Sequence, residues 1–433
     1  MPRDRRDHCT LAGGHLTGGA AGAMGDRGFG GSQWAAALAA GGCVLALIIV
    51  ALIIVGCGRE RRAAGVAADG KRHYTAYSAA GEVTDASGAV NIYAATGANA
   101  LAPAAAKARR LVYVPNSLSS SVSVIDPATY QVVRTFKTGA VPQHVVPSYD
   151  LTQLWVLNNR AGTVTAIDPM TGVEGATIKV DDPYNMYYTP DGQYAIVVAE
   201  KRDRLDFRDA GTLQLVQSVH ADCRGIDHME FTADGQYMIA TCEFNGHLIE
   251  VDLATKRPVG DLALDSTGHD PAMPQDIRSS PDGSVFFVAD MKRNGVHLID
   301  PVSFRRVGFI PTGIGTHGLY PSRDGRLLYV TNRGWNTLKA GRHGPGSVTV
   351  IDPIARKVVA TWTIPGGGSP DMGNVTADGK ELWVSGRYDD EVYVFDTRTG
   401  ALTHRIPVGR EPHGLCVWPQ PGRYSLGHTG NMR

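Results

Sequence analysis

The amino-acid sequence predicts an all-β protein, a seven-bladed β-propeller whose four-stranded blades are closed into a ring by the last inner strand. Three observations support this fold class. An apolar strand that ends in aspartate occurs seven times, another β-rich run precedes each of these strands, and Asp-Gly turns recur between the runs. Four antiparallel strands in a repeat of about 44 residues are typical of a propeller blade.

The composition is that of a folded chain without a strong net charge. The protein has 433 residues, of which 42 are basic and 42 are acidic, and 43% are hydrophobic. This balance excludes an intrinsically disordered chain, and it gives no reason to expect nucleic acid as a partner. The sequence carries no motif for nucleotide hydrolysis, for a Rossmann cofactor or for a lipase-type nucleophile.

The chain begins with an extension over residues 1–33, in which Met24 is an alternative translation start. Residues 34–57 carry no charge and include a long apolar run, which predicts a signal sequence or membrane anchor. The segment ends in Ile54-Val55-Gly56-Cys57, which resembles a bacterial lipobox with Cys57 as the lipidated residue. An uncleaved helix is the alternative, because the run is longer than the usual signal core of about 7–15 residues.

The apolar segment at residues 34–57 predicts attachment to the membrane, and the residues after it predict a linker. Arginines flank the apolar segment on both sides, so the charge rule does not decide its orientation. We expect the propeller on the extracytoplasmic side, tethered to the cell membrane. Residues 58–108 are rich in alanine, glycine, serine and threonine and predict a flexible linker, from which a short strand at residues 90–93 could dock on the main domain.

The repeats place the propeller at residues 109–419 and leave residues 420–433 as a C-terminal tail. The marker aspartates are 41 to 52 residues apart, and they are Asp126, Asp168, Asp209, Asp252, Asp300, Asp352 and Asp396. The tight turns combine an aspartate that can bond its own backbone with a glycine that accepts positive φ. They begin at Asp191, Asp234, Asp282, Asp324 and Asp378.

Closure of the ring is predicted from the two ends of the repeat region. The first unit enters at its second strand, Leu111–Val114, and has no inner strand before it. An inner-strand sequence without a blade of its own lies at residues 411–418. We therefore expect this segment to pair beside Leu111–Val114 and to seal the ring.

One unit carries a recognisable sequence. Leu328-Tyr329-Val330-Thr331-Asn332, preceded by Thr316-His317-Gly318-Leu319 and followed by Ser347–Asp352, resembles the YVTN-repeat (YncE-like) β-propellers. The resemblance covers about residues 109–419 and is specific for the fold, not for the function. It implies binding of a ligand, cofactor or partner on a funnel-shaped face. Relatives include the copper-bearing propeller of nitrous oxide reductase and the haem-bearing propeller of cytochrome-type nitrite reductases.

The starts of the inner strands should ring the mouth of the channel. Imidazole and carboxylate groups gather there, and such groups bind transition metals. The candidate ligands are His144, His228, His317, His413, Asp227, Asp276 and Asp371. A single transition metal or a haem is possible, whereas Gln143, Asn185 and Asp276 argue against a multinuclear copper cluster. The alternative is that these polar residues only hydrate a water-filled channel.

Basic residues follow the second strand in five of the seven units, on the same face. They are Arg160, Lys201, Arg202, Lys292, Arg293, Arg333 and Arg387. Arginine suits carboxylate and phosphate groups, so these residues predict a rim that accepts a small anion, unless they are solvated or paired with nearby acids. Two insertions, Asp265–Met273 and Gly334–Gly346, fall on this face, and the second offers Trp335 as an aromatic surface for a ligand.

The cysteines suggest one disulfide. Cys223 and Cys242 flank a predicted hairpin, and in an exported protein they are expected to form a disulfide. The alternatives are a Cys/His metal site with His228 or two reduced thiols. Cys416 lies in the sealing strand, where a small buried apolar residue fits.

These features together predict a membrane-tethered, extracytoplasmic propeller that binds a small anionic ligand or an envelope protein on its loop-rich face. The alternative is a metal- or haem-dependent oxidoreductase or lyase with its cofactor at the channel mouth. The sequence singles out no catalytic residues, so a binding protein is expected over an enzyme.

Truncation at about residue 410 tests the predicted closure. Loss of the sealing strand should leave the ring open and remove its cooperative unfolding, because the first blade then lacks its inner strand. Limited digestion with chymotrypsin provides the measurement. A truncated protein that resists the protease as well as the full chain would contradict the predicted closure.

Overall fold

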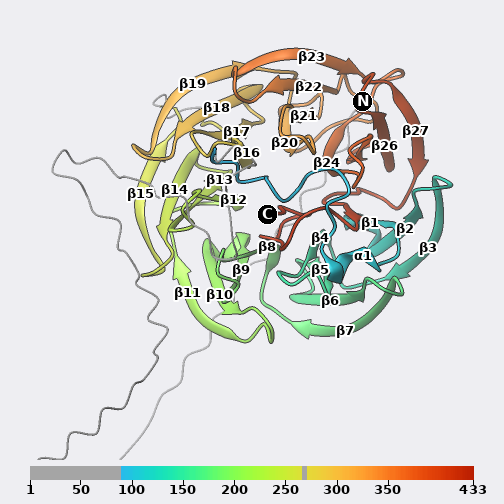
Figure 1. The fold of residues 1–433 in the computed structure, drawn as a ribbon, viewed down its shortest axis with the longest axis horizontal. Helices are drawn as coiled ribbons and strands as arrows, with labels where there is room; N and C mark the ends of the chain where they lie inside the picture. The colour runs from blue at the N-terminus through green and yellow to red at the C-terminus, as the bar shows by residue number, and fades with distance from the viewer. Residues whose placement is uncertain (1–88, 266–270) are drawn as a thin grey trace, which may run out of the picture. The chain divides into compact units, whose positions relative to one another are not determined.

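The computed structural model describes residues 89–265 and 271–433. Their strands form seven four-stranded antiparallel sheets, arranged as blades around a central channel (Figure 1), which confirms the predicted fold class. The predicted membrane segment and Cys57 lie outside these residues. Within the described ranges, no helix is long and apolar enough to cross a membrane.

The first three blades contain residues 111–220 and, as the inner strand of the first blade, residues 416–418. From the channel outward, the first blade consists of β28 (Cys416–Trp418), β1 (Leu111–Asn116), β2 (Ser121–Asp126) and β3 (Gln131–Lys137). The second consists of β4 (Pro142–Pro147), β5 (Leu154–Asn158), β6 (Thr163–Asp168) and β7 (Val173–Lys179). The third consists of β8 (Pro183–Tyr188), β9 (Tyr194–Ala199), β10 (Arg204–Asp209) and β11 (Leu215–His220).

Four further blades complete the ring. The fourth consists of β12 (Ile226–Phe231), β13 (Tyr237–Cys242), β14 (His247–Asp252) and β15 (Arg257–Ala263). The fifth consists of β16 (Pro274–Ser279), β17 (Phe286–Asp290), β18 (Gly295–Asp300) and β19 (Arg305–Pro311). The sixth consists of β20 (Thr316–Pro321), β21 (Leu328–Asn332), β22 (Ser347–Asp352) and β23 (Lys357–Thr363). The seventh consists of β24 (Pro370–Val375), β25 (Glu381–Gly386), β26 (Glu391–Asp396) and β27 (Leu402–Pro407).

The turns explain why the repeat carries its two aspartates. Each of the seven marker aspartates accepts a hydrogen bond from a backbone N–H two or three residues later, which starts the turn into the outer strand. In the Asp-Gly turns, the aspartate accepts from a serine or threonine hydroxyl two residues earlier. The following glycines have φ between 65° and 79°, a region that favours glycine.

Closure follows the predicted pairing. β28 pairs antiparallel with β1, with Leu111 opposite Trp418 and Tyr113 opposite Cys416. Trp418 is 1% exposed and packs in a core cluster with residues of the first two blades. The last strand of the ring therefore joins the two ends of the repeat region, as a closed propeller requires.

Residues 89–108 differ from the predicted flexible linker. They cross the ring over its centre as the blue segment of Figure 1 and end in the short helix α1 (Pro103–Ala106). Tyr93 is buried, and its hydroxyl donates to the Ser279 carbonyl at 3.1 Å, while the backbone N–H of Ile92 donates to Pro281. This part of the expected linker is thus packed on the propeller, because Ile92, Tyr93 and Ala105 bury apolar surface there.

Residues 420–433 also differ from the expected tail. They are mostly buried and fold back along β8, where Leu426 accepts from the Tyr188 N–H and the His428 N–H donates to Met186. The side chain of the terminal residue, Arg433, forms an ion pair of 2.7 Å with the buried Glu230. The C-terminal segment therefore fills one end of the channel and carries His428 towards its other end.

Candidate functional site

The inner strands begin at one end of the channel, here called the mouth, and their first residues are displaced from the regular ladder. The register shifts between Ile226 and Met229 in β12, and the inner strands β4, β8, β16, β20 and β24 shift at the same place. In β12 the N–H of His228 donates instead to the Thr241 hydroxyl at 3.0 Å. These bulges turn polar side chains into the channel, which explains why the strand starts line it.

In residues 89–265 and 271–433, five histidines meet in the channel: His144, His228, His317, His413 and His428. Each is at most 1% exposed, and neighbouring rings have centroids 4.8 to 6.4 Å apart. The sequence identified the first four. His428 was missed, because it lies in the segment interpreted as a tail and has no repeat position that would place it at the channel.

One group, the His317 triad, consists of His317, Asp371 and His413, whose potential ligand atoms lie within 4.8 Å of one another. His317 Nδ1 is 3.0 Å from Asp371 Oδ1, and His413 Nε2 is 3.4 Å from Asp371 Oδ2. Burial by itself would raise the pKa of Asp371, but the charge of Arg333 and the contacts with His317 and His413 hold it well below its usual value. Burial lowers the pKa of His317 to about 4 and that of His413 far below its usual value.

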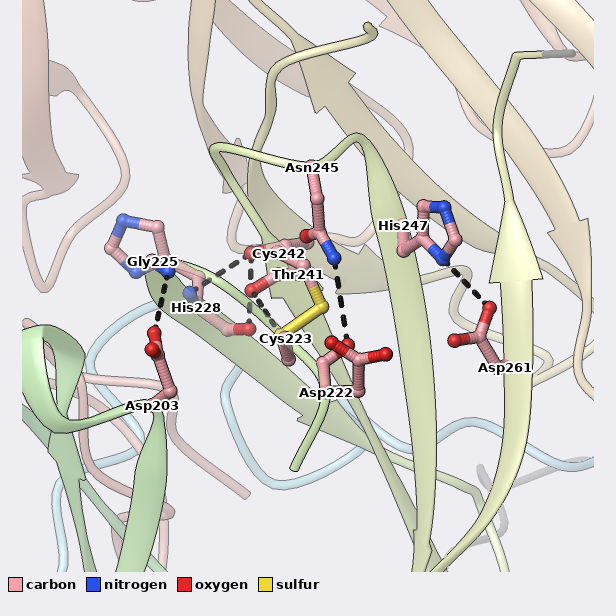
Figure 2. The surroundings of a disulfide bond; sticks show 10 residues. All are labelled: Asp203, Asp222, Cys223, Gly225, His228, Thr241, Cys242, Asn245, His247 and Asp261. Atoms are coloured by element: carbon pink, nitrogen blue, oxygen red, sulfur yellow. Dashed lines mark hydrogen bonds and ion pairs between the residues drawn. A yellow bond between two sulfur atoms is a disulfide. The ribbon is translucent and has the colours of Figure 1, made fainter. Parts of the chain in front are cut away.

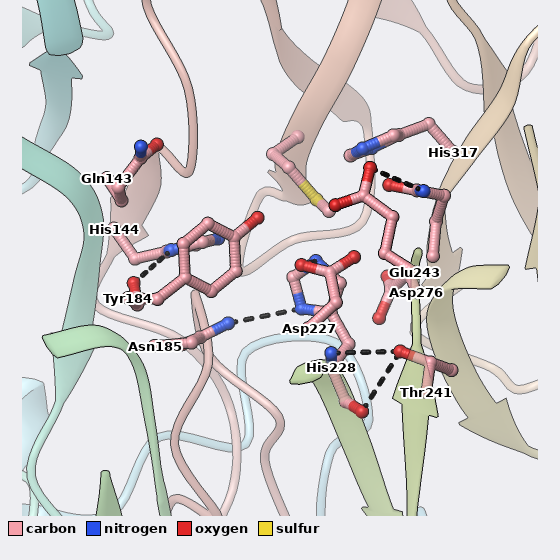
Figure 3. A network of polar contacts seen from close by, with 12 residues as sticks. Gln143, His144, Tyr184, Asn185, Asp227, His228, Thr241, Glu243, Asp276 and His317 are labelled. Carbon is pink, nitrogen blue, oxygen red and sulfur yellow. Dashed lines mark hydrogen bonds and ion pairs between the residues drawn. The ribbon is translucent and has the colours of Figure 1, made fainter. Parts of the chain in front are cut away.

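A second group, the His428 triad, consists of His144, His228 and His428, again with ring nitrogens within 4.8 Å of one another. His144 Nδ1 lies 2.9 Å from the Tyr184 carbonyl oxygen. The amide nitrogen of Asn185 lies 3.1 Å from His228 Nδ1, as Figure 3 shows, and 2.9 Å from His428 Nδ1. Burial lowers the pKa of His144 to about 3 and holds those of the other two well below their usual value, so all three rings are neutral near pH 7.

The remaining predicted carboxylates stand beside these groups. Asp227 is 1% exposed, and neither of its oxygens has a hydrogen-bond partner among the described residues. Burial raises the pKa of Asp227 and of its neighbour Glu243 (Figure 3). Asp276 is bound instead by Arg278 at 3.0 Å and by the Leu319 N–H at 2.9 Å. Asp276 therefore belongs to an ion pair and not to either triad.

The predicted basic rim is divided between two environments. Arg333 is buried, and its Nε donates to Asp371 Oδ1 at 2.6 Å, while Arg387 lies 3.7 Å from the other oxygen of Asp371. The other cations remain at their loops. Arg160, Lys201 and Arg202 are exposed, Lys292 and Arg293 are half-buried, and Arg293 forms an ion pair with Asp265. Two of the seven predicted cations, Arg333 and Arg387, thus lie against the carboxylate of the His317 triad.

The insertion at residues 334–346 packs on the loop that follows β25. Arg342 binds Asp390 at 3.1 Å and the backbone of Asp389. Trp335 is half-buried, and its indole nitrogen is buried without a hydrogen-bond partner. Its ring leaves no room for a Cβ atom at Gly344, so the glycine allows the loop to close over the indole.

A disulfide joins Cys223 and Cys242 near the mouth (Figure 2), with Cα atoms 4.9 Å apart. Cys223 precedes β12 and Cys242 ends β13, so the bond ties the start of an inner strand to its neighbour. It leaves no thiol for the alternative Cys/His metal site with His228. Cys416 is a free, buried thiol in β28.

Glu200, in the short 3₁₀ helix Glu200–Arg202 after β9, is expected to make the stability of the protein depend on pH. Burial, and then the charge of Glu243, raise its pKa from 4.5 to about 7. A carboxyl group whose pKa is higher in the folded than in the unfolded protein favours folding at pH values below its pKa in the unfolded protein. This contribution is lost as the pH rises through its pKa in the folded protein. We expect Glu200→Gln to stabilise the protein more at pH 8 than at pH 4.5 in urea unfolding. An equal effect at both pH values would contradict the raised pKa.

Comparison with known proteins agrees with this architecture. The model of the family described as YNCE-like beta-propeller matches residues 76–421. None of the curated proteins matches the chain. Among solved structures, Kuenenia stuttgartiensis hydrazine synthase is 20% identical, with a TM-score of 0.52 over 63% of this chain and 88% of that chain.

Two further structures share the fold. The dihydro-heme d1 dehydrogenase NirN, in complex with DHE, is 15% identical, with a TM-score of 0.53 over 71% of this chain and 75% of that one. A protein of unknown function from Desulfotomaculum acetoxidans is 14% identical, with a TM-score of 0.58 over 72% of this chain and 100% of that one. At these identities the likeness concerns the fold alone. Because the family model matches most of the chain, residues 76–421, this protein belongs to the YNCE-like β-propeller family.

Proposed function

We propose that this protein is a membrane-tethered, extracytoplasmic propeller that binds one transition-metal ion in the His317 triad. Two imidazoles and one carboxylate are common ligands for such ions, and three protein ligands leave positions open for a further ligand. The observation that carries the proposal is the contact of His413 Nε2 with Asp371 Oδ2 at 3.4 Å.

This contact brings together two hydrogen-bond acceptors, each of which presents a lone pair. The His413 ring is neutral, and its Nδ1 faces the Gln143 carbonyl oxygen at 3.3 Å, so Nδ1 carries the proton. Nε2 then has a lone pair and lies 3.4 Å from the ionised Asp371 Oδ2, which has no hydrogen-bond partner among the described residues. A buried pair of this kind is unfavourable unless a cation lies between the two atoms. Histidines that bind metals usually donate their other N–H to a carbonyl, as His413 does here.

The charges around the mouth favour a cation over a small anion. Arg333 and Arg387, the two arginines nearest the triad, are already engaged with Asp371, and Arg387 also lies 3.5 Å from Glu411. The carboxyl groups of Glu200, Asp227 and Glu243 have raised pKa values because burial disfavours their charged form. A cation nearby would relieve that cost, whereas an anion would increase it.

A haem fits this site less well than an ion does. The structure of NirN is described as a complex with DHE, and this raises the question of a haem here. The neighbouring imidazole rings in this channel have centroids only 4.8 to 6.4 Å apart. Each of the five rings is at most 1% exposed and is surrounded by the others, so a buried ion fits among them better than a group as wide as a porphyrin.

The extracytoplasmic location has one structural argument besides the N-terminal segment. The Cys223–Cys242 disulfide suits an oxidising compartment, since disulfides are rare in reducing cytosols. Residues 34–57 would tether the propeller to the membrane, either through lipid on Cys57 or as an uncleaved helix.

Metal analysis tests the proposed site. Full-length protein without an affinity tag, purified in detergent, should bind about one zinc or cobalt ion per chain. His413→Ala should weaken this binding at least tenfold, since even loss of an outer partner costs about 10- to 100-fold. His220→Ala changes an exposed histidine of β11 and provides the control. Equal metal content and affinity in the two variants, or no uptake of zinc, cobalt, copper or iron by the folded wild type, would refute the site.

Lipid attachment distinguishes the two kinds of anchor. If Cys57 is lipidated, cells fed a labelled fatty acid should incorporate the label into the wild type and lose it in Cys57→Ser. Cys43→Ser, a change in the same apolar segment, should keep the label. A membrane-bound wild type without label would establish the uncleaved helix instead.

A further inference from the structure

Asn185 in β8 lies between two of the channel histidines and determines what they can bind. Its side-chain oxygen accepts the N–H of Met186 at 2.8 Å. This fixes the orientation of the amide, so its NH₂ group faces His228 Nδ1 at 3.1 Å and His428 Nδ1 at 2.9 Å. An NH₂ group has two protons to donate, one for each ring.

The donated protons set the tautomer of both histidines. A neutral imidazole carries one proton, so a ring that accepts at Nδ1 carries its own proton on Nε2. The surroundings agree, since Tyr187 Oη lies 3.2 Å from His228 Nδ1 and can donate to it. Carboxylate oxygens of Asp227 and Asp276 lie 3.4 and 3.8 Å from the Nε2 atoms of His228 and His428, respectively. Nε2 of each ring is therefore an N–H donor.

His144 has the opposite tautomer. Its Nδ1 faces the Tyr184 carbonyl oxygen at 2.9 Å and must donate a proton to it, which leaves a lone pair on Nε2. Among the described residues, the Nε2 atoms of His144, His228 and His428 are buried and have no hydrogen-bond partner, and one ring nitrogen from each of these histidines lies within 4.8 Å of the other two. The His428 triad thus offers two donors and one acceptor at the centre of the channel.

This set matches one protonated oxygen atom and not a metal ion. An oxygen at the centre of three nitrogens that are at most 4.8 Å apart lies at most about 2.8 Å from each, and this upper limit is a normal hydrogen-bond length. It can accept from His228 and His428 and donate to His144. A metal ion would need a lone pair on every ring nitrogen, and two of the three carry protons.

We infer that Asn185 reserves the His428 triad for a single hydroxyl oxygen, from water or from a small alcohol-type ligand, and keeps a metal ion out of it. The inference rests on the proposed function only in placing this oxygen site beside the metal site of the His317 triad. Asn185 acts through the histidines, so it is a positioning residue.

The variant Asn185→Asp reverses the tautomers without changing the shape of the side chain. A carboxylate accepts protons where the amide donates them, so both histidines should move their proton to Nδ1 and present Nε2 lone pairs. The full-length protein in detergent should then bind about two zinc ions per chain, compared with about one for the wild type. Asn374→Asp adds a carboxylate elsewhere in the channel, where Asn374 contacts Thr429, and should leave the zinc content unchanged.

Histidine tautomers can be read directly in the wild type. With ¹⁵N-labelled histidine, NMR correlations between ring protons and ring nitrogens should assign the proton to Nε2 in His228 and His428 and to Nδ1 in His144. Protons on Nδ1 of His228 and His428 would overturn the inference, and this measurement does not depend on how the variants fold.

The metal counts separate this inference from the proposed function. A wild type without zinc and an Asn185→Asp variant with about one ion would support the tautomer inference and refute the His317 site. Two zinc ions in the wild type would overturn the inference, as would an unchanged count in a folded Asn185→Asp protein.

Discussion

The antiparallel pairing of β28 with β1 is the contact on which the rest of the structure depends. It joins residues from the two ends of the repeat region and turns seven separate sheets into a closed ring. Without it, the first blade would lack its inner strand and expose the unpaired edge of β1 to the channel. The same strand leads the chain into the C-terminal segment, so closure also delivers His428 and the Glu230 partner Arg433 to the channel.

The channel buries many polar groups, and their desolvation costs free energy of folding. Burial keeps the histidines neutral, and neutral rings need a partner for each nitrogen. The structure supplies partners for the Nδ1 atoms of four rings, from carbonyl oxygens or from Asn185. The Nε2 atoms of the His428 triad have none in the part of the chain that the structure describes. Such a pattern is expected of a site that is completed by something other than protein.

The two triads differ in chemistry although they share the same residue type. In the His317 triad a carboxylate and a neutral ring present electron pairs to each other, which favours a cation. In the His428 triad two rings present protons and one presents a lone pair, which favours an oxygen with its own proton. Side by side, they form a channel mouth in which a metal ion and a hydroxyl oxygen could be held together. The charge of Arg333 lowers the pKa of the Asp371 carboxyl, and Arg387 lies 3.7 Å from its other oxygen.

The sequence alone determined the repeat, the turns, the closure and the four histidines of the strand starts. These features are local or periodic: an aspartate that bonds a backbone N–H two or three residues later needs no knowledge of the rest of the chain. Only the tertiary structure decided how the ring of polar residues divides into two triads, and that Arg333 turns inward to Asp371. It also brought His428 to Asn185, which lies 243 residues earlier. Such contacts depend on the register of strands and on the path of a segment without a repeat pattern, and neither is encoded in the spacing of residues.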